Sequence, residues 1–224
     1  MAKGIASIDP IFQLKNSKER DRFYGKLDAV QNGYYQTIVD TAVTCCNARA
    51  GTGKTFIATL AALNLLADGK VNKIFYIRYP DELSLKMGFF PGDKYEKEEI
   101  YKAPFMDAAK YLGVQPETID ELIDGDFLEI TTHIGLRGRN LDNCIIISDE
   151  SQNANLSDLK LVLTRVHDNS KVVLLGHEGQ QDNKRTDHGF LRYIEHLCKK
   201  PWAKEIKLVK NYRGKISVWA DELS

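Results

Sequence analysis

A glycine-containing loop that could bind phosphate occupies residues 48–55, with the sequence Ala-Arg-Ala-Gly-Thr-Gly-Lys-Thr. An apolar, β-branched run precedes it and a strongly helical run follows it, and this strand–loop–helix context is typical of a GxxxxGK[ST] phosphate-binding loop. Gly51 and Gly53 can adopt positive φ and leave room for a phosphate against bare backbone. The alternative is a glycine turn that happens to precede a helix.

Each residue of this loop has an expected role. Lys54 would reach the β- and γ-phosphates of a nucleotide, and the Thr55 hydroxyl would take one position around Mg²⁺. Ala48 replaces the usual first glycine, which is tolerable if φ is negative there. Backbone N–H groups and the start of the following helix would supply partial positive charge to the phosphates. The other loop residues expected to contact the nucleotide are Arg49, Ala50, Gly51, Thr52 and Gly53.

Two adjacent acids, Asp149 and Glu150, follow the apolar run at residues 144–148. Ligands of open α/β sheets bind beyond the carboxyl ends of the strands, which is where these acids would lie. Asp149 could hold Mg²⁺ directly or through water, and Glu150 could act as a general base on the attacking water. The two acids could instead cap the following helix or be solvated, but the phosphate loop upstream favours the catalytic interpretation.

A third polar segment, residues 174–182, also follows an apolar run. A polar side chain at this position could sense the γ-phosphate and report its presence to the rest of the protein. Gln180 is the candidate sensor. The alternative is a surface loop made of turn residues.

Composition restricts the class of protein. The chain has 224 residues, 31 Lys+Arg against 31 Asp+Glu, and four cysteines without C-x-x-C spacing. Zero net charge means that nucleic acid could bind only at a local patch. The cysteines fit core thiols in a reducing compartment, and neither a membrane-spanning run nor a signal-peptide pattern is visible. We therefore expect a soluble cytoplasmic protein with no membrane partner.

Alternating strands and helices predict an α/β fold, a mostly parallel sheet covered by helices on both faces. The expected strands are 42–46, 73–77, 127–132, 144–148, 171–175 and 206–209. The expected helices are 18–29, 55–67, 97–112, 116–123, 156–166, 188–199 and 216–223, with another helical turn or two at 34–41. Gln31, Asn32 and Gly33 are expected to end the first helix.

Several blocks follow one another in the order and spacing of the PhoH-like proteins, a family that looks like the first RecA-like domain of superfamily 1 helicases. The resemblance covers about residues 25–220. It implies a single RecA-like P-loop NTPase domain, which we place at residues 31–224, after an N-terminal helical extension that we expect at residues 1–30. The blocks are the phosphate loop, Met-Gly-Phe-Phe-Pro-Gly-Asp at 87–93, Leu-Arg-Gly-Arg at 136–139, Asp-Glu-Ser-Gln-Asn at 149–153, Leu-Thr-Arg at 163–165, and the segment from Gly176 to Gln180.

The resemblance implies further roles. Gln31 lies where related helicases place a glutamine that reads adenine, and an amide can both donate to and accept from the adenine edge, which favours ATP. Gln180 corresponds to the glutamine of the helicase-like Gly-Asp-x-x-Gln motif, in which His177 replaces the aspartate here. Pro80 comes one residue later than in the family's Arg-Pro pair. Together these positions imply a Mg²⁺-dependent ATPase.

Phosphoryl transfer also needs an arginine near the γ-phosphate, from the same chain or from a neighbouring one. Helicases normally supply it from a second RecA-like domain, and this chain is too short to hold one, so we expect self-assembly in which one chain's arginine reaches the next chain's nucleotide. Head-to-tail contacts close into rings, and six subunits is the expectation by analogy. Arg213, Arg137 and Arg139 are the candidates, and each could equally be a phosphate contact or a solvated side chain.

RNA or single-stranded DNA is an expected partner. Arg137, Arg139 and the Phe89–Phe90 loop could contact such a strand, extended by Lys199, Lys200 and Lys204. The phenylalanines could instead be packed in the interior. A second hypothesis is an ATP-controlled oligomeric switch or scaffold that moves no strand. A third, a kinase of a small metabolite, is less favoured because Glu150 after a metal-binding aspartate is typical of ATPases.

Overall fold

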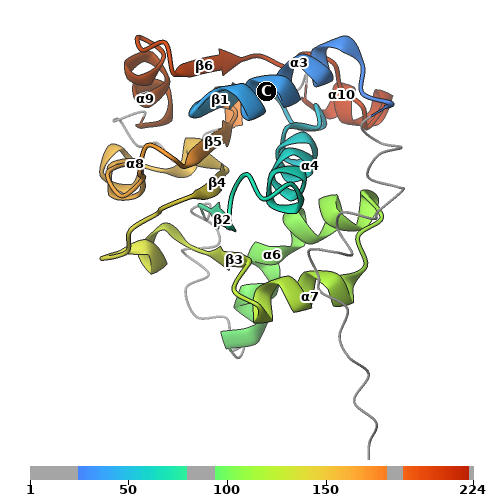
Figure 1. The fold of residues 1–224 in the computed structure, drawn as a ribbon. Helices are drawn as coiled ribbons and strands as arrows, with labels where there is room; N and C mark the ends of the chain where they lie inside the picture. Colours follow the sequence, from blue (N-terminus) through green and yellow to red (C-terminus); the bar gives the residue numbers. More distant parts are fainter. Residues whose placement is uncertain (1–24, 80–93, 181–188, 222–224) are drawn as a thin grey trace, which may run out of the picture.

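A computed structural model describes residues 25–79, 94–180 and 189–221. Its centre is a six-stranded sheet in the order β3-β2-β4-β5-β1-β6, and every neighbouring pair is parallel (Figure 1). The strands are β1 (Val43–Asn47), β2 (Lys73–Arg78), β3 (Leu128–Thr131), β4 (Cys144–Asp149), β5 (Lys171–Gly176) and β6 (Ala203–Ile206).

Helices cover both faces of this sheet. The first face carries α3 (Ala29–Asp40), α4 (Lys54–Ala67), α6 (Lys94–Tyr111) and α7 (Pro116–Asp124), which share one hydrophobic core. The second face carries α8 (Leu156–Leu163) and α9 (Gly189–Leu197), which share the other. A last helix, α10 (Lys215–Asp221), follows β6. The predicted α/β class, with a parallel sheet and helices on both faces, is confirmed.

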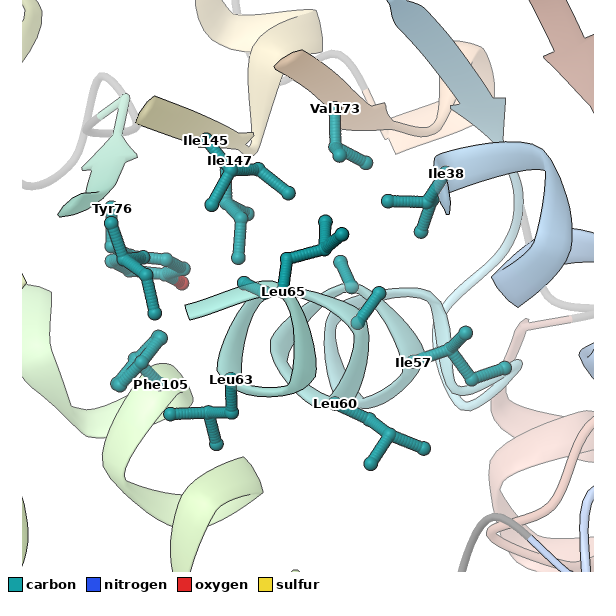
Figure 2. Close-up of a cluster of buried hydrophobic side chains, with 14 of the residues drawn as sticks. Ile38, Ile57, Leu60, Leu63, Leu65, Tyr76, Phe105, Ile145, Ile147 and Val173 are labelled. Carbon is teal, nitrogen blue, oxygen red and sulfur yellow. The ribbon is translucent and has the colours of Figure 1, made fainter. Parts of the chain in front are cut away.

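Helix α4 is the centre of the first core because it is apolar almost all round. Figure 2 shows Leu65 directed toward Ile145, Ile147 and Val173 of the sheet, and Leu63 directed toward Phe105 of α6. Burying a leucine side chain contributes about 1.5–3 kcal/mol to folding stability. A helix that is apolar on most sides is stable only when those sides are buried, as they are here. The start of this helix, and with it the phosphate loop, is therefore held firmly against the sheet.

The strand order brings two predicted site segments together at the carboxyl ends of the strands. Strand β5 lies between β1, which precedes the loop, and β4, which ends in the acids. Parallel strands end at the same edge of a sheet, so the loop and the acids meet there. The register fixes this closely, because Asn47 is paired with Gly176 and Ser148 with Leu174. The predicted meeting of the phosphate loop and the two acids is confirmed.

The predicted helix end at residues 31–33 is wrong. Helix α3 starts at Ala29 and runs through Gly33 to Asp40, so it crosses the predicted domain boundary at residue 30, and that boundary stays a prediction. The Asp28 side chain accepts hydrogen bonds from the N–H groups of Val30 and Gln31, and the Gln31 side chain accepts from the N–H of Asp28. This capping box starts a helix at that point. Most of the predicted helix at 18–29 lies outside the described residues.

The last strand is also displaced from its predicted position at 206–209. Strand β6 is Ala203–Ile206, and Val209 is 87% exposed. The charged residues Lys204 and Glu205 pair with β1, which an edge strand tolerates because one side meets water. The other predicted elements are present with ends shifted by a few residues. In the described part of the chain, no helix combines the length and apolar character that a membrane span requires.

Alanine substitutions at two helical glycines should change the free energy of unfolding in opposite directions. A Cβ on Gly189 would lie 2.6 Å from the Asn155 carbonyl carbon and 2.7 Å from the Leu156 nitrogen, whereas a Cβ on Gly33 would meet nothing within 4 Å. We expect Gly189→Ala to lower the free energy of unfolding by about 1–3 kcal/mol through overpacking. Gly33→Ala should raise it by about 0.5–1 kcal/mol. Urea unfolding of both variants measures this, and equal effects would contradict the packing of α9 on α8.

Candidate functional site

The loop between β1 and α4 has the backbone shape expected for a phosphate site. Gly51 has φ +79° and Gly53 φ +80°, as predicted for these glycines. The φ of Ala48 is not positive, and its N–H donates to the Gly176 carbonyl (2.9 Å), so alanine is tolerated in place of the usual glycine. The Thr52 hydroxyl donates to the Arg49 carbonyl (2.8 Å) and closes the loop.

The expected metal-binding pair is brought together across the sheet edge. Thr55, in the first turn of α4, places its hydroxyl 3.4 Å from Oδ2 of Asp149 at the end of β4. Lys54, the first residue of α4, is 8% exposed, and Asp149 is 2% exposed. A hydroxyl and a carboxylate of this kind are oxygen ligands that suit Mg²⁺, which keeps its other positions for water and phosphate.

Strand alternation directs Asp149 toward the loop. Side chains two residues apart in a strand lie on the same face, so Asp149 shares the face of Ile147, which packs in the core around α4. Ser148 lies on the opposite face, where its hydroxyl is hydrogen-bonded to that of Ser151 (2.9 Å). A shift of β4 by one residue would therefore turn Asp149 to the opposite face of the sheet, away from the loop.

Tyr76 of β2 is a site residue that sequence reasoning missed. Its buried hydroxyl donates to Oδ2 of Asp149 (2.5 Å), and the N–H of Glu150 donates to Oδ1 (3.0 Å). Burial, and after it the charge of Glu150, still raise the pKa of Asp149, while burial raises the pKa of Tyr76 well above its usual value and keeps it a donor. A cation bound beside Asp149 would oppose the cost of burying this carboxylate. Only the strand register could have indicated Tyr76.

Glu150 is held in a strained conformation beside Asp149. Its φ is +53° and its ψ +36°, a left-handed conformation that costs a residue with a side chain about 1–2 kcal/mol. Its Oε2 accepts from the buried amide of Gln152 (2.6 Å), whose Oε1 accepts from the N–H of His177 (3.2 Å). Gln152 thus aims the acid and joins it to the segment after β5. Strain of this kind clusters at functional sites.

The segment predicted to carry the sensor begins beside the phosphate loop. The Asn47 side chain donates to Glu178 (3.2 Å) and accepts from the N–H of Glu178 (3.2 Å). These bonds join the end of β1 to the short helix η3 (Glu178–Gln180). Gln180 is the last residue of η3, and its side chain lies outside the described part of the structure.

Two further candidates lie close to the loop. The Gln31 Nε2 is 3.7 Å from the position that a Cβ on Gly53 would take. Arg213 is exposed, and the N–H of the residue before it, Tyr212, donates to the Gly51 carbonyl (2.8 Å). A predicted adenine reader and a predicted arginine therefore border the same loop.

The other candidates differ in their surroundings. Arg137 is exposed and follows the short helix η1 (His133–Leu136), in which His133 stacks on Tyr79 and lies 3.6 Å from Asp158 of α8. Arg139 forms an ion pair with Glu129 and lies over the Phe75 ring. The strand-contact candidates Lys199, Lys200 and Lys204 are exposed, whereas Phe89, Phe90 and Pro80 lie outside the described residues.

Comparison with known proteins gives the family. The family model described as PhoH-like protein matches residues 26–216. A PhoH-like protein of Synechocystis is 36% identical over 152 residues, which cover 68% of this chain and 46% of that protein. Protein PhoH2 of Bacillus subtilis is 31% identical over 182 residues, 78% of this chain and 41% of that protein.

The chain spans less than half the length of these curated relatives. Among solved structures, the Hef helicase domain of Pyrococcus furiosus superposes with a TM-score of 0.47 at 15% identity, covering 87% of this chain and 40% of that one. The family match extends from α3 to α10 and includes the phosphate loop and both acids. This chain belongs to the PhoH-like protein family.

Proposed function

We propose that the chain binds ATP with Mg²⁺ and hydrolyses it at the edge formed by β1, β4 and β5. The observation that carries the proposal is the approach of Thr55 to Asp149, with Glu150 next in the chain. A positive-φ loop opening a helix is suited to phosphate, and a hydroxyl facing a buried carboxylate is suited to a divalent cation.

Each residue of this site has a proposed role. The N–H groups of the loop and the Lys54 ammonium bind the phosphate chain, and Thr55 and Asp149 hold Mg²⁺, which neutralises phosphate charge. Glu150, aimed by Gln152, accepts a proton from the attacking water. Gln180 senses the γ-phosphate. Gln31 binds adenine through its amide, whose Oε1 also accepts from the N–H of Asp28.

Two of the three arginine candidates have different proposed roles. Arg213 follows Tyr212, which contacts the phosphate loop, so we assign Arg213 to the γ-phosphate in its own chain. Arg137 is exposed after η1, and we assign it to the nucleotide of a neighbouring subunit. A head-to-tail homo-oligomer, with a six-membered ring as the specific form, follows from that second role.

We further propose that ATP hydrolysis is coupled to RNA or single-stranded DNA in a helicase-like cycle. The exposed Arg137 is its main support within the described residues. The alternative is an ATP-controlled oligomeric switch or scaffold without strand movement. A cytoplasmic location is also proposed, on the ground that Cys45, Cys46, Cys144 and Cys198 are all free thiols.

Replacing the proposed base should separate binding from turnover. In Glu150→Gln we expect ATP affinity within a few-fold of wild type and turnover lower by about 10²–10⁴, the usual contribution of a general base. Lys54→Ala should lose both. Glu205→Gln, which changes an exposed carboxylate on β6, is the matched control and should leave both unchanged. Calorimetric binding and phosphate release measure the two quantities, and near-normal turnover in Glu150→Gln rejects the assignment.

Removing one hydroxyl should weaken the metal site. Tyr76→Phe removes the donor to Asp149, so the ionised carboxylate is less stabilised and the Mg²⁺ concentration for half-maximal activity should rise about tenfold. Tyr34→Phe is the control, because this buried hydroxyl donates to the Lys54 carbonyl (3.4 Å) instead. A Mg²⁺ titration of ATPase activity measures the effect. Equal midpoints in the two variants would contradict the role of Tyr76.

The motor and switch hypotheses predict different responses to nucleic acid. A strand-coupled enzyme should hydrolyse ATP severalfold faster with single-stranded RNA or DNA. A switch should show a constant, slow rate. ATPase rates with and without each polymer, beside native mass measurements with ATP, distinguish the two. A protein that remains monomeric while hydrolysing ATP fully would contradict an arginine supplied by a neighbour.

A further inference from the structure

The side chain of Asn211, in the segment between β6 and α10, lies directly against the phosphate loop. Its Nδ2 donates to the Ala50 carbonyl (3.3 Å), and a Cβ on Gly51 would lie 2.8 Å from both its Oδ1 and its Nδ2. The next residue, Tyr212, donates its N–H to the Gly51 carbonyl (2.8 Å). Two consecutive carbonyl groups of the loop are therefore held by two consecutive residues of this segment.

The same amide shapes the turn that carries Arg213. Oδ1 of Asn211 accepts from the N–H groups of Arg213 (2.8 Å) and Gly214 (3.3 Å). Gly214 has φ +107°, which a residue with a side chain rarely adopts. Nδ2 also donates to the Ser217 hydroxyl of α10 (3.1 Å). Asn211 thus makes all four hydrogen bonds that an asparagine amide can form.

Tyr212 anchors the segment at its other side. Its hydroxyl donates to Asp28, and the Lys210 ammonium lies 3.3 Å from the same carboxylate. The N–H of Gln31, and after it the Tyr212 hydroxyl and the Lys210 ammonium, lower the pKa of Asp28 to about 2. Asp28 also caps α3 beside Gln31. Residues 210–217 therefore join the phosphate loop to the helix that carries the proposed adenine reader.

Peptide geometry explains what these contacts do to the loop. In a trans peptide the carbonyl of one residue and the N–H of the next point in opposite directions. Holding the Ala50 and Gly51 carbonyls from the side of Asn211 therefore turns the N–H groups of Gly51 and Thr52 to the other side. Donors fixed in this way form an anion-binding concavity before any ligand arrives, which reduces the ordering cost of binding.

We propose that Asn211 is a positioning residue that preorganises the phosphate loop through its Nδ2 and directs Arg213 through its Oδ1. The nucleotide readouts of this inference rest on the proposed ATPase function, whereas the loop geometry does not. Its two halves use different atoms of one side chain, so they can be separated by substitution. Asn211→Asp retains the acceptor and loses the donor, and Asn211→Ala loses both.

The first measurement uses the nucleotide-free protein. Amide hydrogen exchange at Tyr212 should accelerate in both Asn211 variants, because the loop contact is lost in each. Exchange at Arg213 and Gly214 should accelerate in Asn211→Ala and stay protected in Asn211→Asp. Ser217→Ala, which removes only the bond to α10, is the control and should leave Tyr212 protected. Uniform acceleration over the whole chain, or none at residues 212–214, overturns the inference.

The second measurement uses MgADP and ATP. MgADP has no γ-phosphate, so it reports the loop alone, and its affinity should fall about tenfold in both Asn211 variants. At saturating ATP, kcat should fall about a further tenfold in Asn211→Ala and much less in Asn211→Asp. MgADP affinity within twofold of wild type in Asn211→Ala, or an equal loss of kcat in both variants, overturns the inference. If the wild type binds no nucleotide, the proposed function fails, and the exchange pattern alone decides the role of Asn211.

Discussion

The burial of the Asp149 carboxylate is the constraint on which the site depends. A carboxylate removed from water is costly unless it is hydrogen-bonded and opposed by charge. Tyr76 and the backbone N–H of Glu150 supply the hydrogen bonds, yet burial still raises the pKa of Asp149. The charge of Lys54 acts against this rise in pKa and stabilises the ionised carboxylate. A cation beside the Thr55 hydroxyl, which lies 3.4 Å from Oδ2 of Asp149, would stabilise it further.

The rest of the fold follows from keeping that carboxylate at one place. Asp149 faces α4 only because β4 ends in the register that puts Ile147 and Asp149 on the core side. Helix α4 in turn is buried on most sides, so its first turn cannot move away from the sheet. The energy that fixes the site is thus hydrophobic, while its chemistry is carried by a few polar groups at the edge.

Sequence predicted those parts of the fold and site that depend on local pattern. Apolar runs located five strands closely, and the loop motif located Lys54 and Thr55. Prediction from sequence failed where a contact between distant segments decides the local structure. Gly33 was expected to end a helix, yet α3 continues through it because Tyr34 and Ile38 are buried in the core around α4. Tyr76 has no local signal, because its role depends on the strand register alone.

The phosphate loop likewise depends both on its local sequence motif and on contacts with distant segments. The motif specifies which residues permit the backbone shape, but three separate parts of the chain then hold it. The sheet holds Ala48 through Gly176, the segment after β5 is tied to Asn47, and the segment before α10 holds the carbonyls of Ala50 and Gly51. Glycine loses more conformational entropy on folding than any other residue, so a loop with two glycines needs such external contacts to keep one conformation. A short motif found without these partners would lack the contacts that hold its backbone in this shape.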